Sequence, residues 1–127
     1  MTGTPTEGTD VTLTVRRQDL LGPVLARVIG MVAARAHCPV DRLDDALLLS
    51  DAIAAHAPAQ ARNGSVTVRV RSGKDGLTLH VGGLSPDGPK AVLEAASLPG
   101  VGNVFERVAS TIDTGGEELR LHLAFGS

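Results

Sequence analysis

The sequence predicts an α+β fold, a two-layer sandwich in which helices cover one face of a mostly antiparallel, mixed sheet. Several short segments alternate apolar and polar residues, which is the pattern of strands that are buried on one side only. Two longer segments near the start carry apolar residues at helical spacing instead. Helices that are grouped apart from paired strands are typical of α+β domains.

Length and composition bound the architecture. A chain of 127 residues is the size of one domain, and we expect that domain to span residues 11–127. Residues 1–10 are rich in Thr, Gly and Pro and are expected to form a disordered tail. Hydrophobic residues make up 43% of the chain but aromatic residues only 2%, so the core must be built from Leu, Val, Ile and Ala.

The same composition excludes several classes of partner. Aromatic platforms on which nucleic-acid bases could stack are nearly absent. A net charge of −2 does not attract duplex DNA or an anionic membrane, so we expect neither as a partner. No apolar run is long enough to span a bilayer. Cys38 is the only cysteine and cannot form an intramolecular disulfide, so we expect a cytoplasmic location.

The N-terminal half predicts one strand followed by two helices. Val11–Val15 alternates and is expected to be an edge strand. Leu20–Ala36 has a continuous apolar face, and a second helix is expected over Asp41–Ala57, with Asp41 as its N-cap. The positive end of this helix suits the three acids at its start, Asp41, Asp44 and Asp45.

The C-terminal half predicts two hairpins. Ser65–Arg71 and Leu77–Val81 alternate and are joined through Asp75-Gly76, a strong turn signal. Thr111–Asp113 and Leu119–Leu123 form the second pair. Between the hairpins, the chain from residue 82 to residue 102 is rich in Gly and Pro and long enough to be a functional loop. We expect short helices within and after this loop, over Lys90–Ala96 and Asn103–Ser110.

The second predicted helix contains the most informative stretch, Leu47–Ala57. It resembles the N-box helix of anti-sigma factors and serine-protein kinases in the histidine-kinase-like ATPase family, where an acid is followed four residues later by Asn. In that family the acid is the general base of phosphoryl transfer and the Asn holds Mg²⁺. Asp51 stands at the position of the acid and Ala55 at that of the Asn. Because alanine cannot bind a metal, the resemblance implies that Asp51 is a vestigial general base.

Two further boxes complete the resemblance, which covers residues 11–123. After the central hairpin the family has Asp-x-Gly-x-Gly, whose carboxylate accepts a hydrogen bond from the adenine amino group. Gly83 replaces that Asp here, which removes a hydrogen bond of roughly 1.5–3 kcal/mol. A Gly-x-Gly before a helix can cradle phosphates, although alone it is more often a turn. The positions that correspond to the family's nucleotide-binding residues are Asp51, Gly83, Gly100, Gly102 and Asn103.

With both polar contacts replaced, we expect a decayed ATPase that needs no cofactor. It would be a regulatory protein that resembles an anti-sigma factor and acts by protein–protein binding in transcriptional or stress signalling. The resemblance implies a sigma factor, an anti-sigma antagonist or a like domain as partner, and a homodimer through Val11–Val15 and the Leu20–Ala36 helix. The alternatives are an active anti-sigma serine-protein kinase that binds ATP and Mg²⁺, and an unrelated α+β domain.

No other chemistry is indicated by the sequence. His37, His56, His80 and His122 are scattered without the spacing of a metal site, so no metal is expected. The histidines at 80 and 122 fall on outward strand positions and are expected to be solvated. Cys38 lies at a helix end, and we expect it to be a small apolar residue rather than a nucleophile.

Overall fold

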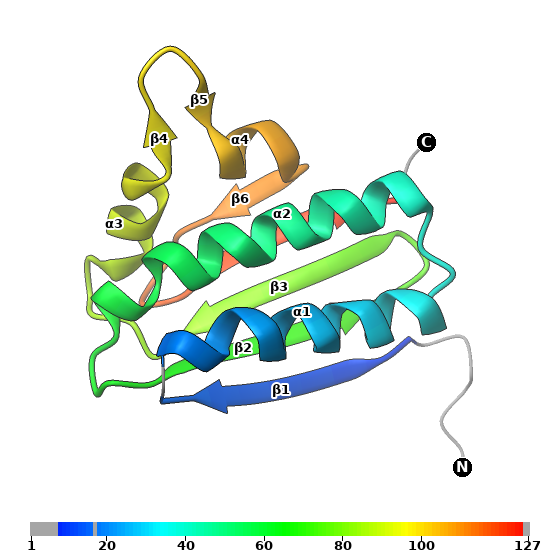
Figure 1. The fold of residues 1–127 in the computed structure, drawn as a ribbon, viewed down its shortest axis with the longest axis horizontal. Helices are drawn as coiled ribbons and strands as arrows, with labels where there is room; N and C mark the ends of the chain where they lie inside the picture. Colours follow the sequence, from blue (N-terminus) through cyan, green and yellow to red (C-terminus); the bar gives the residue numbers. More distant parts are fainter. Residues whose placement is uncertain (1–7, 17, 126–127) are drawn as a thin grey trace.

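The computed structural model describes residues 8–16 and 18–125 as a sheet with helices on one face (Figure 1). The elements in chain order are β1 (Asp10–Val15), α1 (Gln18–Arg35), α2 (Val40–His56), η2 (Pro58–Gln60), β2 (Val66–Ser72), β3 (Gly76–Gly82), α3 (Gly88–Ala95), β4 (Ser97–Leu98), β5 (Gly102–Asn103), α4 (Val104–Val108), β6 (Thr111–Asp113) and β7 (Leu119–Ala124). The main sheet has the order β1-β2-β3-β7-β6, and a separate two-stranded sheet pairs β4 with β5.

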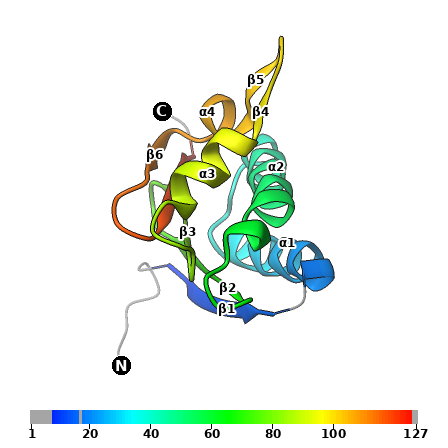
Figure 2. The same ribbon diagram turned by 90° about the vertical axis from the view of Figure 1, so that its left-hand side faces the viewer.

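The α+β class and the covered sheet face are confirmed. Figure 2 shows β1, β2 and β3 in one layer and α1 and α2 in the other. The expectation of a mixed sheet is wrong, because every pair of neighbouring strands is antiparallel. The reason lies in the connection after β1: α1 and α2 run back and forth across the sheet, so the chain enters β2 in the direction opposite to β1.

The three central strands bury one side chain in two, as their alternation predicts. Val68 of β2 lies opposite Val81 of β3, and Val70 lies opposite Leu79. Strand β7 continues these rows of apolar side chains, since Leu121 pairs with Leu79. All of these residues are at most 2% exposed. The apolar face of α1 packs on the β1 and β2 side of this sheet, and its four most deeply buried large side chains are Leu21, Leu25, Ile29 and Val32.

Strand β1 is the edge strand that the sequence predicts, and it begins one residue earlier, at Asp10. Its pairing continues through Thr9, whose carbonyl oxygen accepts a 2.8 Å hydrogen bond from the amide of Ser72. The amide of Thr9 in turn donates to Ser72 Oγ at 2.9 Å. Most of the expected N-terminal tail, residues 1–7, lies outside the described residues.

Helix α1 ends in a left-handed turn at His37, whose φ is +56°. The amide of Cys38 donates to the carbonyl of Ala33 at 3.0 Å, and the amide of His37 donates to Ala34 at 3.3 Å. This is the Schellman arrangement, which satisfies the last carbonyl groups of a helix. It stops α1 at Arg35, one residue before the predicted end.

The prediction that Asp41 is the N-cap of the second helix is wrong. Pro39 occupies that position, and its φ of −58° already directs the chain into α2 without any side-chain hydrogen bond. Asp41 lies in the first turn of the helix, where its carboxylate still suits the positive end of the helix dipole. The predicted end of this helix near Ala57 is confirmed, because α2 ends at His56 with Ala57 as its C-cap and a short 3₁₀ turn, η2, begins at Pro58.

The segment between the two predicted hairpins is more ordered than its composition indicates. Helix α3 begins two residues before the expected Lys90, and α4 covers only five residues of the expected Asn103–Ser110. Between them, β4 and β5 form a hairpin that projects beyond the rest of the molecule in both views (Figures 1 and 2). This hairpin brings part of the expected loop beside α2.

Candidate functional site: an apolar groove beside α2

A groove of about 450 Å³ lies between α2 on one side and the β4–β5 hairpin with α4 on the other. Its walls are mostly aliphatic, with one acid and one base among them. The lining residues are Asp45, Leu48, Leu98, Val101, Gly102, Val104, Arg107 and Val108. We call this feature the α2 groove.

Three large apolar side chains of the α2 groove are open to water. Leu48 is 48% exposed, Leu98 58% and Val101 56%. They come from α2, from β4 and from the hairpin turn, and they are half of the six large apolar residues that are exposed in the described part of the chain. Exposed apolar side chains that gather in one hollow, rather than lying singly over a surface, mark an interaction site.

The hairpin that carries two of these side chains is built by its glycines. Gly100 and Gly102 have φ values of +77° and +100°, which other residues rarely adopt. They close a tight turn in which the amide of Val101 donates to the carbonyl of Leu98 at 3.0 Å. The turn therefore presents the side chains of Leu98 and Val101 at its tip, on the side of α2.

Asn103 anchors the base of the hairpin and is only 7% exposed. Its Oδ1 accepts hydrogen bonds from the amides of Phe105 at 2.9 Å and Glu106 at 3.3 Å, which makes it the N-cap of α4. Its Nδ2 donates to the carbonyl of Leu93 at 2.5 Å and to Ser97 Oγ at 3.0 Å. These four bonds use the full capacity of an amide side chain, so none is left for a nucleotide.

The two glycines of the predicted phosphate cradle lie in the β4–β5 hairpin, directly before α4. Gly100 and Gly102 belong to the hairpin rather than to the first turn of a helix. The amides that open α4 are already occupied, because Asn103 accepts from both Phe105 and Glu106. Of the predicted nucleotide-contacting residues, Gly102 is the one that lines the α2 groove.

Asp51 and Ala55 lie near the groove but outside its lining. Both are exposed on α2, and Asp51 follows Leu48 by one helical turn. Within the described residues, no hydrogen bond or ion pair engages the Asp51 carboxylate. The N-box stretch therefore does contribute to the site, through Leu48 rather than through its acid.

Gly83 lies at the end of β3, where it packs on the chain that precedes β2. Its carbonyl accepts a 2.8 Å hydrogen bond from the amide of Arg62. Its φ is +77°, and an added Cβ would lie only 3.0 Å from the carbonyl oxygen of Ser65. Gly83 is not among the residues of the α2 groove, so the structure does not bring the three predicted boxes into one pocket.

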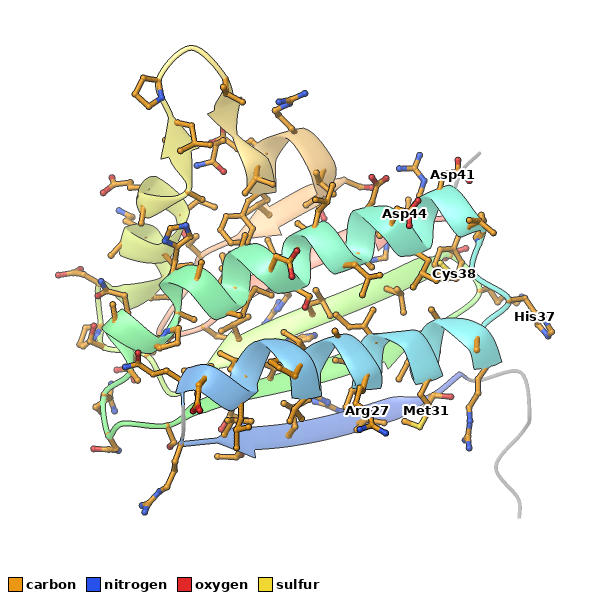
Figure 3. The ribbon with its side chains drawn as sticks, viewed as in Figure 1. Arg27, Met31, His37, Cys38, Asp41 and Asp44 are labelled. Carbon is orange, nitrogen blue, oxygen red and sulfur yellow. The ribbon has the colours of Figure 1, made fainter. Side chains whose placement is uncertain are left out.

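Charges at the α2 groove are unequally distributed. Asp45, at the rim, pairs with Arg42 at 3.0 Å. Asp44 and Asp51 are exposed and unpaired within the described residues. Figure 3 shows Asp44 and its neighbour Asp41 on the side of α2 that faces away from α1. On the hairpin side, the exposed Arg107 likewise has no ion-pair partner in the described ranges.

The other titratable groups fit structural roles. Burial raises the pKa of the Cys38 thiol, and the nearby Asp41 carboxylate adds to the rise, so the thiol is a poor nucleophile. His80 Nδ1 lies 3.2 Å from Glu118 Oε1, and His122 Nδ1 lies 3.0 Å from Thr78 Oγ1. The expectation that both histidines are simply solvated is therefore wrong, because the His80 side chain is only 13% exposed, His122 is half-buried, and each has a side-chain partner.

Within residues 8–16 and 18–125, His, Cys, Asp and Glu side chains nowhere gather in a group of three that could hold a metal ion. In the same ranges, none of the helices has both the length and the apolar character needed to cross a membrane. No protein-family model matches the sequence, and the comparison with curated proteins also finds no match.

Proposed function

We propose that this protein is a regulatory protein-binding module, an anti-sigma-like regulator in transcriptional or stress signalling that binds no nucleotide. The observation that carries the proposal is the aliphatic lining of the α2 groove. In the family that the sequence resembles, the helix corresponding to α2 directs its acid and its Asn at the phosphates of ATP. In this chain the hollow beside that helix is lined instead by Leu48, Leu98, Val101 and other apolar residues.

The arrangement of polar groups argues against the kinase alternative. Phosphoryl transfer depends on a bound Mg²⁺ and a firmly positioned nucleotide. Ala55 offers no metal ligand and Gly83 no acceptor for adenine. Asn103 has no free hydrogen-bonding group, since its amide side chain makes four bonds within the protein. An active kinase would need substitutes for all three contacts.

An apolar groove has a simple use in a protein-binding module. Side chains such as Leu48 and Leu98 are about half exposed, so a partner that covers them removes apolar surface from water, worth roughly 25 cal/mol per Å² before the costs of association. A sigma factor, an anti-sigma antagonist or a domain of the same kind is the partner that the proposal expects.

Photo-crosslinking tests the proposal without knowledge of the partner. A photoreactive side chain is placed at position 98 or 101 of the full chain, which is expressed in its native cells and irradiated. The matched control places it at Met31, which is 43% exposed on the side of α1 away from α2 (Figure 3).

We expect positions 98 and 101 to give a discrete adduct with a protein other than this chain. Position 31 lies in the helix of the homodimer that the resemblance implies, so it should give at most an adduct between two copies of this chain. Mass spectrometry distinguishes the two adducts and names the partner. Adducts from position 31 alone, or no protein adduct from any position, would contradict the proposal.

A further inference from the structure

We infer that the occupant of the α2 groove is an amphipathic helix of a partner protein, with basic residues along the flank that lies over α2. This inference rests on the proposed function and specifies the partner's chemistry. It follows from the shape of the groove, from the shortness of the hairpin strands, and from the charges on the two rims.

The openness of the groove disfavours a small molecule. Sites for small ligands enclose most of the ligand surface, typically about 70–90% of it. Here the three side chains at the mouth, Leu48, Leu98 and Val101, are themselves 48–58% exposed. A small apolar ligand would therefore remain largely in water, whereas a protein segment can cover the groove and both of its rims.

The strands of the hairpin are too short to accept a partner strand. Addition of a β-strand needs an exposed sheet edge along which main-chain hydrogen bonds can form. Each of β4 and β5 has only two residues, and these already pair with each other. The remaining common mode of peptide recognition in an apolar groove is a helix that inserts side chains spaced by three or four residues.

Charge selects the kind of helix. Asp44 and Asp51 lie one turn before and one turn after Leu48, so all three share the outward side of α2. Neither acid has a partner within the described residues. Lysine or arginine on the adjacent flank of a docked helix would pair with them, and an acid on the opposite flank would meet Arg107 across the groove.

The same charges disfavour a second copy of this chain in the groove. In a two-fold dimer the same surface meets itself. The outward side of α2, with Asp41, Asp44 and Asp51, would then face an identical row of carboxylates. Like charges at an interface oppose association, so the complementary partner is basic where this chain is acidic.

Three fluorescent peptides of about 14 residues, stapled to remain helical, provide the probes. The first and second peptides carry leucines at positions i, i+3, i+4 and i+7, and in the third peptide the same leucines are placed out of this order. The first has Lys and Arg on one flank and Glu on the other, the second has Glu on both flanks, and the third has the charges of the first with the leucines scrambled.

Binding to the full chain is followed by fluorescence anisotropy at low ionic strength. We expect the first peptide to bind at least about tenfold more tightly than the other two.

Variants of the chain locate the binding. Leu48→Ser and Val101→Ser should each weaken the first peptide by about tenfold. Met31→Ser replaces a similarly exposed apolar residue outside the groove and should change nothing. Asp44→Asn combined with Asp51→Asn should weaken binding of the first peptide several-fold and strengthen binding of the second, because the repulsion between its Glu side chains and these two carboxylates is removed. Circular dichroism of each variant confirms that it is folded.

Equal binding of basic and acidic peptides, insensitivity to Leu48→Ser and Val101→Ser, or no binding by any peptide would overturn the inference. The proposed function fails separately. If photo-crosslinks from positions 98 and 101 still capture a protein when no peptide discriminates, the module binds a partner of other chemistry. If the chain binds Mg²⁺–ATP tightly, the proposed function itself is wrong.

Discussion

The side-chain amide of Asn103 donates a 2.5 Å hydrogen bond to the carbonyl oxygen of Leu93, which ties the hairpin to the last turn of α3. The oxygen of the same amide caps α4 through the backbone of Phe105, a residue that is fully buried. One side chain thus joins α3, the β4–β5 hairpin and α4, and the hairpin and α4 form one wall of the α2 groove.

Asn103→Ala is expected to lower the free energy of unfolding by about 2–3 kcal/mol. The change removes a helix cap and leaves the buried amide of Phe105 and the carbonyl of Leu93 without partners. Urea denaturation measures the loss. Asn103→Ser is the matched control, because its hydroxyl oxygen can still accept from the amides that open α4 while both bonds donated by the amide nitrogen are lost, so its loss should be smaller. Equal losses for the two variants would show that capping is not the main contribution.

An aspartate at the end of β3 is expected to destabilise the protein at position 83 but not at position 82. Gly83→Asp should lower the free energy of unfolding by about 1–2 kcal/mol, because φ is +77° and the new Cβ would crowd the Ser65 carbonyl at 3.0 Å. Gly82→Asp is the control, since a Cβ there meets nothing closer than 3.9 Å. Thermal melts distinguish the two. If the Gly83→Asp protein is as stable as the parent, a side chain at position 83 is not strained and the prediction is wrong.

His37→Gly is expected to raise the free energy of unfolding by about 0.5–1 kcal/mol. His37 holds the left-handed position of the Schellman turn at the end of α1, where glycine has no steric penalty. It lies at the end of the molecule and points away from it (Figure 3), so few contacts are lost. His37→Ala keeps the penalty and should bring no gain. If alanine stabilises the protein as much as glycine does, backbone conformation is not the cause.

The pKa of Asp10 is expected to rise when Arg69 is replaced. Arg69 donates two hydrogen bonds to this carboxylate, at 2.9 and 2.6 Å, and so holds the pKa of Asp10 below its ordinary value. NMR titration of Arg69→Gln should show the pKa restored. Arg71→Gln should move it less, because Arg71 lies 3.6 Å away. Equal shifts in the two variants would contradict a dominant role for Arg69.

The lowered pKa of Asp10 determines how the stability from the Asp10–Arg69 pair changes with pH. Because the folded-state pKa is depressed, the pair stabilises the fold fully above the pKa of the unfolded carboxyl group. The contribution disappears as the pH falls through the folded-state value. It remains small, because the side chains of Asp10 and Arg69 are 43% and 46% exposed and water screens the pair.

Elements with a clear period could be predicted from the sequence, and the two shortest strands could not. β2, β3 and β7 were predicted because each buries every second residue over six or seven positions. β4 and β5 have two residues each, which is too short to show alternation. The N-cap prediction for Asp41 followed residue preference, whereas the backbone of Pro39 already begins the helix.

The candidate site was predictable in part, for a similar reason. The stretch Leu47–Ala57 contains Leu48, which lines the α2 groove, but the resemblance singles out Asp51 and Ala55 in this stretch and gives Leu48 no role. Leu98 and Val101 were not identified, because in a Gly- and Pro-rich loop an exposed apolar residue has no period to set it apart. Gly100 and Gly102 flank Val101, but a pair of glycines in a sequence indicates a tight turn as readily as a phosphate site.

Calorimetric titration of the full chain with ATP, with and without Mg²⁺, tests the central claim most directly. If α2 and the hairpin form a protein-binding groove in place of a nucleotide site, no binding heat is expected even at nucleotide concentrations of about 1 mM, which corresponds to a binding free energy weaker than about −4 kcal/mol. Mg²⁺-dependent binding with a Kd of about 1 μM, near −8 kcal/mol, would contradict the account and return Asp51 to the role of a general base.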